Sequence, residues 1–392
     1  MRKEGKNGFQ TAKVSTIAAV HFIHDCYTSF LAPALPLIIE KLGISYGLTG
    51  LLAVIQRIPS LFNPLIGIAA ERPGMRYMVI LSPAVTAVSM SLIGIAPAYA
   101  FLAILLFVSG ASSAFWHIPT PVMVKRFSGK KTGKGMSFYM VGGELARTAG
   151  PLIILGVISL WGIEGTWKMM PLGFVASIIL FYQFRHAKIR PATSSRQHKE
   201  GSYWQIFRRF APAFLLTGGY TFFQAGIKSS LTYYLPTFLT ATGNSLHFSE
   251  LALTAIQLAG AAGAFFAGTL SDRLGRMRTL LIISIATPLF TLLFLSLKGW
   301  WIFPVLLPLG FFLFAPISVM LALVAELDTK KKAFVNSIYM TFNFFVSVAI
   351  YPLVGFFIDQ AGFLPTFRAI AFLGFGAVVV VLLTRRHPLV QG

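Results

Sequence analysis

The sequence predicts an all-α polytopic membrane protein whose twelve transmembrane helices form two halves of six. Two observations predict this fold: the composition is strongly apolar, and one short motif occurs twice, about half a chain apart. Of the 392 residues, 56% are hydrophobic and 11% are charged, and the mean hydropathy is +0.73. A soluble domain carries about 25% charged residues. Lipid must therefore be the solvent for much of this chain.

Twelve apolar stretches are long enough to cross a bilayer. They divide the chain into an N-terminal half (residues 1–184), a polar and basic linker (185–209) and a C-terminal half (210–392). The predicted spans lie near residues 14–39, 48–70, 77–97, 100–124, 136–160, 166–184, 210–239, 249–271, 278–297, 300–325, 333–357 and 362–384.

The basic residues indicate how the chain is threaded through the membrane. The formal net charge is +21, and most Lys and Arg residues lie in the tails, the linker and every second loop. Because basic loops stay on the cytoplasmic side, we predict a plasma-membrane protein with both termini in the cytoplasm. This placement favours a topological role for the charge over a nucleic-acid partner. The loops assigned to the other side hold only Lys41, Lys168, Lys298 and Arg368.

The repeated motif reads Gly, three residues, an acid, Arg, one residue and Gly. The acid lies just before the next helix, where it stabilises the positive end of the helix dipole, and the second glycine relieves a tight turn. We expect these loops to latch the cytoplasmic side in one conformation and to release it in another. The simpler alternative is a tight loop whose charges set the topology. The predicted latch residues are Gly67, Glu71, Arg72 and Gly74 in the first copy, and Gly268, Asp272, Arg273, Gly275 and Arg276 in the second.

With this duplicated motif, the chain resembles the major facilitator superfamily over essentially its whole length. The resemblance implies two six-helix bundles, a cavity between them at mid-membrane, and alternating access by rocking. A narrower resemblance is to the fosmidomycin-resistance branch, which implies export of small polar drugs against protons. The residues that carry this second resemblance are His24-Asp25, the segment 110–119, Val141-Gly142-Gly143 and Gly150-Pro151.

Acidic and imidazole groups inside the first span are the first functional candidates, because ionisable groups within a membrane are costly. An acid beside imidazoles in a partly dry cavity can exchange a proton near neutral pH. We therefore predict that Asp25 and His24 couple transport to protons. The alternative is a structural hydrogen-bond cluster, and for His21, nearer the cytoplasmic end, that structural role is favoured.

Span five carries a second pair of opposite charges, Glu144 and Arg147, three residues apart. They either pair with each other or reach across, Glu144 as a proton carrier and Arg147 toward an anionic substrate or Asp25. The following Gly150-Pro151 predicts a helix kink and close helix packing.

Basic residues outnumber acidic residues within the predicted spans. The basic residues are Arg57, Arg147 and Lys228, and the acidic residues are Asp25 and Glu144. A small anionic or zwitterionic substrate fits this balance. Trp116, His117 and Gln224 complete the predicted substrate site. For Arg57 and Lys228 the alternative is snorkelling to the membrane interface. For Trp116 and His117 the alternative is a position at that interface without a substrate role.

The leading hypothesis is a secondary transporter that exports its substrate in exchange for protons. The alternative is proton-coupled uptake of an organic anion by the same residues. We find no nucleophile with a base, no metal-ligand spacing and no phosphate loop, so we expect no enzyme activity, no cofactor and no metal. The expected partners are a small-molecule substrate, protons and the lipid bilayer, and we expect a monomer.

Overall fold

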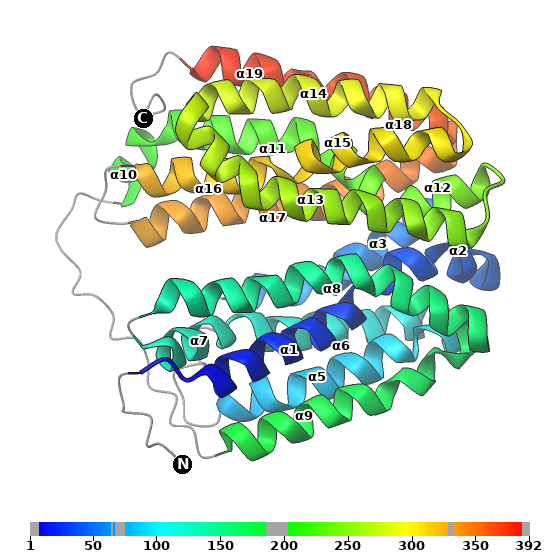
Figure 1. Ribbon diagram of the computed structural model, residues 1–392. Coiled ribbons are helices and arrows are strands. Elements are labelled where there is room, and N and C mark those ends of the chain that lie inside the picture. The colour runs from blue at the N-terminus through cyan, green and yellow to red at the C-terminus, as the bar shows by residue number, and fades with distance from the viewer. Residues whose placement is uncertain are drawn as a thin grey trace. The chain divides into compact units, whose positions relative to one another are not determined.

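The computed structural model describes residues 8–63, 66, 75–129, 131–185, 203–327 and 332–385. Within these ranges the chain is almost entirely helical and contains no strand, which confirms the predicted all-α class (Figure 1). Ten of the described helical segments are long and apolar enough to cross a membrane. The chain is a multi-pass membrane protein.

The chain divides into two compact units, Met1–Ile44 with Leu51–Ser195, and Ser45–Gly50 with Arg196–Gly392. The helices up to residue 185 are α1 (Thr11–Thr28), α2 (Leu31–Leu42), α3 (Tyr46–Arg57), η1 (Ile58–Phe62), α5 (Met75–Ser91), η2 (Ile93–Ile95), α6 (Tyr99–His117), α7 (Thr120–Ser128), α8 (Thr132–Trp161), η3 (Ile163–Met169) and α9 (Met170–Phe184).

The helices from residue 203 onward belong to the second unit, and α10 lies within the predicted linker. They are α10 (Tyr203–Arg209), α11 (Ala211–Thr232), α12 (Leu235–Ala241), α13 (Leu246–Leu274), α14 (Arg276–Ser296), η4 (Gly299–Trp301), α15 (Ile302–Phe314), α16 (Pro316–Glu326), α17 (Lys332–Ala361), α18 (Phe363–Gly374) and α19 (Gly376–Thr384).

Several predicted spans consist of two consecutive helices, and prolines explain where the first helix stops. Proline lacks a backbone N–H and its ring clashes with the preceding turn, so it favours the first turn of a new helix. Pro119 precedes α7, Pro236 lies in the first turn of α12, and Pro316 begins α16. In contrast, α8 continues through Pro151 as one helix of 30 residues.

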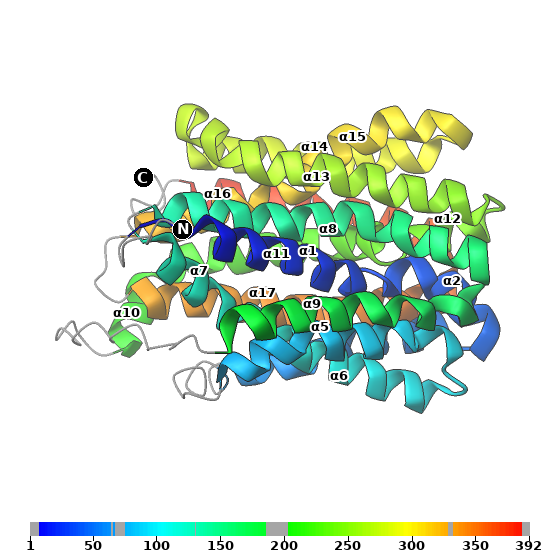
Figure 2. The ribbon, with the colours of Figure 1, turned by 60° about the horizontal axis from the view of Figure 1, so that its bottom comes forward.

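In the first unit, α1 packs along α8, and α5 packs against α6 and α9 (Figures 1 and 2). Glycines on α8 allow the first of these contacts. A Cβ atom on Gly142 would lie 2.4 Å from the Ala18 carbonyl oxygen, and one on Gly150 would lie 2.7 Å from the Ser29 Cβ atom. The two helices α1 and α8 can therefore approach closely because glycine has no side chain, as is usual between membrane helices.

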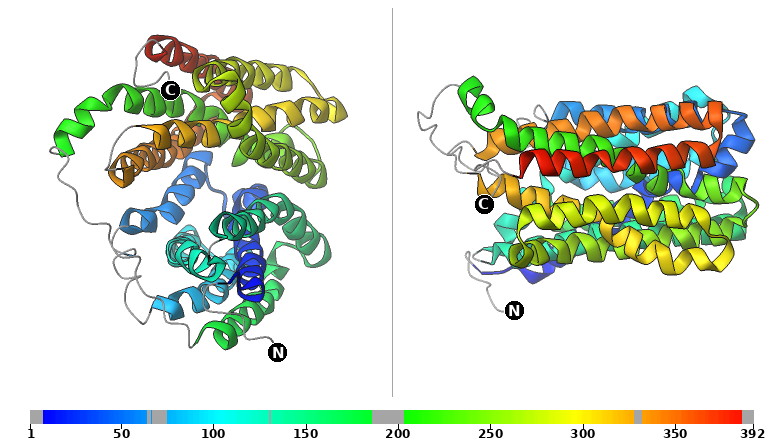
Figure 3. Two further views of the ribbon diagram at one scale, coloured as in Figure 1. Left: turned by 60° about the vertical axis from the view of Figure 1, so that its left-hand side comes forward. Right: turned by 90° about the horizontal axis from the view of Figure 1, so that it is seen from above.

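Each unit has its own apolar core. In the first unit Ile17, Trp116 and Phe184 are fully buried in one cluster. In the second unit α11 contacts α17 and α19, and α13 contacts α15. The contact between α11 (green) and α19 (red) can be followed in Figure 3. Large apolar side chains such as Phe265 and Leu383 are exposed on the surface, as expected where lipid is the solvent.

The glycine contact predicts unequal effects of two alanine substitutions on α8. Gly142→Ala should lower the thermal stability, because overpacking against backbone costs about 1–3 kcal/mol. Gly156→Ala is the matched control, since a Cβ atom there meets nothing within 4 Å. It should be neutral or stabilising by up to about 1 kcal/mol, the helix-propensity difference. Thermal unfolding in detergent measures both, and equal shifts of the two variants would contradict the proposed packing.

Candidate functional site

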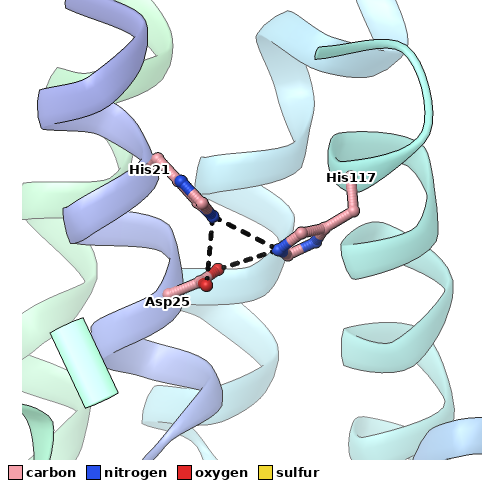
Figure 4. Close-up of side chains that lie close together, drawn as sticks. All are labelled: His21, Asp25 and His117. Atoms are coloured by element: carbon pink, nitrogen blue, oxygen red, sulfur yellow. Dashed lines mark hydrogen bonds and ion pairs between the residues drawn. The ribbon is translucent and has the colours of Figure 1, made fainter. Parts of the chain in front are cut away.

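Three imidazole rings surround the buried carboxylate of Asp25, which is 8% exposed. His21 Nε2 lies 3.1 Å from Oδ2, while His24 Nδ1 and His117 Nε2 lie 2.9 and 3.4 Å from Oδ1. Figure 4 shows the His21, Asp25 and His117 side chains pointing toward one another. His21 and Asp25 are four residues apart and so share one face of α1, while His117 ends α6. The contact between α1 and the end of α6 therefore assembles the cluster.

A chain of hydroxyl groups lies behind His24. Ser112 Oγ donates to the Ser82 carbonyl at 2.9 Å, and Thr86 Oγ1 lies 2.8 Å from Ser112 Oγ. His24 Nε2 lies 3.0 Å from Thr86 Oγ1, and His24 Nδ1 lies 2.9 Å from Asp25 Oδ1. The two ring nitrogens of His24 thus contact a hydroxyl and a carboxylate, and a proton can be exchanged between His24 and Asp25.

The other two imidazoles are oriented by backbone carbonyls. His21 Nδ1 donates to the Tyr139 carbonyl at 2.7 Å, and His117 Nδ1 donates to the Ser113 carbonyl at 2.9 Å. Because a carbonyl can only accept, both Nδ1 atoms are protonated. The two Nε2 atoms lie 3.3 Å apart and both face Asp25. The two Nε2 atoms thus converge on the Asp25 carboxylate.

His21 and Trp116 line the Asp25 cluster. The structural role favoured for His21 stays a prediction: its Nδ1 atom binds the Tyr139 carbonyl of α8, and its Nε2 atom faces Asp25. Trp116 is fully buried and stacks on His24 with ring centroids 5.4 Å apart. It forms a wall of the cluster and leaves His117, whose side chain is 39% exposed, as the accessible member.

One cluster of side chains bears on the expectation of no metal site, which stays a prediction. His21, Asp25 and His117 bring one ligand atom each within 4.8 Å of one another, a group that could hold a metal ion. Sequence spacing did not reveal it, because His117 is 96 residues from His21 and approaches only through helix packing.

Glu144 and Arg147, which could pair or reach across, form an ion pair with each other on α8. Arg147 Nη2 lies 2.6 Å from Glu144 Oε1, and the side chains are 41% and 29% exposed respectively. The two charges neutralise each other in this conformation. Both remain accessible, so a competing anion could reach the guanidinium.

The remaining predicted substrate residues make separate local contacts. Gln224 donates to the Gly374 carbonyl at 3.2 Å, and the Lys228 ammonium lies 5.1 Å from the centre of the Phe314 ring. Arg57 ends α3 and is exposed. Their role in substrate binding stays a prediction.

The second copy of the repeated motif forms a charged cluster around Arg276. Gly275 has a φ angle of +87° between α13 and α14, a conformation that favours glycine. The turn brings Arg276 back over the end of α13, where Nη1 donates to the Gly268 carbonyl at 3.1 Å. Arg276 also pairs with Asp272 and, at 2.5 Å, with Glu326 at the end of α16.

In this cluster Arg276, not Arg273, makes the ion pairs given above, and Arg273 is exposed at the end of α13. In the first copy of the motif, Gly67, Glu71, Arg72 and Gly74 lie outside the described residues. The latch that the sequence predicts there stays a prediction.

Glu250 is a buried acid that the sequence analysis did not single out. It is 1% exposed near the start of α13, and neither carboxyl oxygen has a hydrogen-bond partner among the described residues. The signal was present: Glu250 is the second residue of the predicted span 249–271, where an acid is unexpected.

A polytopic bundle with a buried cluster of proton-binding side chains is typical of a secondary transporter. The chain belongs to the Major Facilitator Superfamily, which matches residues 17–327 and again 220–391. Members of this family are transporters and not enzymes. The family assignment confirms the predicted fold and the absence of enzyme activity.

Relatives of known name cover most of the chain at low identity. The fosmidomycin resistance protein of Escherichia coli K12 is 21% identical over 381 residues, 95% of this chain and 93% of the relative. A multi-drug resistance efflux pump PmrA homolog of Lactococcus lactis is 25% identical over 267 residues, 65% of each chain.

Solved transporter structures share the fold. A bacterial homolog of the human lysosomal transporter Spinster, inward-facing and unoccupied, has a TM-score of 0.71 at 14% identity and covers 98% of this chain and 96% of its own. A POT family transporter in complex with a thioalcohol-conjugated peptide has a TM-score of 0.75 at 13% identity, with 96% of both chains covered.

The Arg276 cluster predicts different outcomes for the two arginines of the motif. Arg276→Lys should lower the free energy of unfolding by about 1 kcal/mol, because an ammonium cannot reproduce the forked hydrogen bonds to Glu326 and Gly268. Arg273→Lys, at an exposed position, should leave stability unchanged within about 0.5 kcal/mol. Thermal unfolding in detergent compares them. Equal destabilisation by both would show that Arg276 is not the centre of the cluster.

Proposed function

We propose that this chain exports a small anionic or zwitterionic organic compound in exchange for protons, by alternating access. The observation that carries the proposal is the buried Asp25 carboxylate, whose oxygens lie within 3.4 Å of ring nitrogens of His21, His24 and His117. Proton exchange needs such a group at a membrane-embedded site. Asp25 and His24 would carry the coupling proton, with Glu144 as a second acceptor.

The Glu144–Arg147 pair supports binding of an anionic substrate at the Arg147 guanidinium. A substrate anion that binds Arg147 replaces Glu144 as its partner. Arg57 and Lys228 would add positive charge to the binding region, with Trp116, His117 and Gln224 shaping it. An anionic substrate is the chemistry that these cations recognise.

The direction of transport is proposed from the relatives. One relative is named a fosmidomycin resistance protein and another a multi-drug resistance efflux pump PmrA homolog. Export from the cytoplasm, across the plasma membrane and with both termini inside, accords with those names and with the distribution of basic loops. Fosmidomycin is accordingly the first compound to test. The alternative, proton-coupled uptake of an organic anion, uses the same residues and is favoured if an inward proton gradient drives accumulation.

The coupling role of Asp25 predicts loss of proton exchange on removal of its charge. Asp25→Asn in proteoliposomes should abolish the pH-gradient dependence of fosmidomycin transport, because an amide cannot take up a proton. Glu164→Gln is the matched control: its carboxylate is exposed and pairs with Lys41 at 2.8 Å, so the change should have little effect. A normal gradient dependence of Asp25→Asn would refute the assignment, and a folded population is verified by size-exclusion chromatography.

The substrate role of Arg147 predicts a loss of affinity graded by charge. Arg147→Gln should weaken binding of an anionic substrate by about 10- to 100-fold, the usual worth of a charge-assisted hydrogen bond. Arg147→Lys retains the charge and should lose less. Substrate-dependent thermal shifts measure both variants, and equal affinities for wild type and Arg147→Gln would exclude Arg147 from the substrate site.

A further inference from the structure

The strongest unassigned feature of the molecule is the triangle of ligand atoms formed by His21 Nε2, His117 Nε2 and the Asp25 carboxylate. We propose that these three side chains form a binding site for a divalent transition-metal ion, with zinc as the best fit. Two imidazoles and one carboxylate are ligands that zinc accepts in open, three-ligand protein sites. The inference goes beyond the transport function proposed above, because metal binding requires no transported substrate.

The size of the triangle fits a tetrahedral metal ion. The nitrogen–nitrogen edge is 3.3 Å, and the two nitrogen–oxygen edges are 3.1 and 3.4 Å. A tetrahedral zinc ion with bonds of about 2.0–2.1 Å has ligand atoms about 3.3 Å apart. An ion could therefore bind without moving the three side chains far from their present positions (Figure 4).

The outer hydrogen bonds of both imidazoles are those of metal ligands. A metal-binding histidine usually donates its second ring N–H to a backbone carbonyl or a carboxylate, which fixes the tautomer and turns the lone pair toward the metal. His21 makes this bond to the Tyr139 carbonyl at 2.7 Å and His117 to the Ser113 carbonyl at 2.9 Å. His24 holds the Asp25 carboxylate in the same way, at 2.9 Å.

Electrostatics also favours a cation at the centre. When both rings are neutral, the ring protons of His21 and His117 are used in bonds to the backbone, and the two Nε2 lone pairs point at each other and at the carboxylate. Acceptors at such separations repel one another unless a positive centre lies between them. A divalent ion satisfies all three acceptors at once.

The space beside the triangle is kept open by a glycine. A Cβ atom on Gly143 would lie 2.8 Å from His21 Cε1, 3.1 Å from His21 Nε2 and 3.3 Å from Asp25 Oδ2. The 39% exposed side chain of His117 gives access from outside the protein core. Water would occupy the fourth coordination position, as in other open zinc sites.

The test is a calorimetric titration of the full chain in detergent with ZnCl2. The chain is purified with a tag that contains no histidine. Wild type should bind one ion and gain thermal stability, since a ligand of the folded state stabilises it. His117→Ala should weaken binding by about tenfold or more. His247→Ala removes an exposed histidine of the second unit and should bind zinc like wild type. Cobalt(II) in place of zinc should produce the intense visible absorption of four-coordinate cobalt in wild type and in His247→Ala but not in His117→Ala.

A variant that keeps all three ligands separates coordination from misfolding. Gly143→Ala fills the space beside the triangle and should weaken zinc binding, whereas Gly156→Ala on the same helix should not. Absence of saturable zinc binding by folded wild type would overturn the proposal, and so would equal zinc affinity of the His117→Ala and His247→Ala variants. If wild type binds zinc but its transport does not depend on the pH gradient, the transport mechanism alone is refuted. If its transport depends on the pH gradient but it does not bind zinc, the metal site alone is refuted.

Discussion

The burial of the Asp25 carboxylate is the constraint on which the rest of the site depends. A carboxylate removed from water needs hydrogen-bond donors or positive charge around it. The chain supplies His21 and His24 from the same helix and His117 from α6. The small residues of α8 then become necessary, because Gly142 and Gly143 leave the space in which α1 and its polar face can lie against α8.

Much of the architecture could be predicted from the sequence because lipid imposes simple rules. A span needs a long apolar run, so the twelve stretches mark the helices, and Pro119, Pro236 and Pro316 begin new helical segments within them. The family followed from the duplicated loop motif. These signals are local, and local signals do not depend on which helix packs against which.

The site was only partly predictable, since its contacts join distant segments. His24 and Asp25 were visible as neighbours, but the approach of His117 depends on how α6 ends beside α1. The spacing of Glu144 and Arg147 permitted both a pair and two separate roles, and only side-chain geometry selects the pair. In the second motif, the turn at Gly275 decides that Arg276, and not Arg273, folds back onto α13.

The hydroxyl chain behind His24 has a consequence for proton traffic. Its hydrogen bonds join His24, Thr86 and Ser112 and end at the Ser82 carbonyl, which has no proton to give. Protons therefore cannot pass beyond Ser82 along these hydroxyl groups. A proton that enters or leaves Asp25 must pass on the side of His21 and His117. A site with a single entrance can be opened to one side of a membrane at a time.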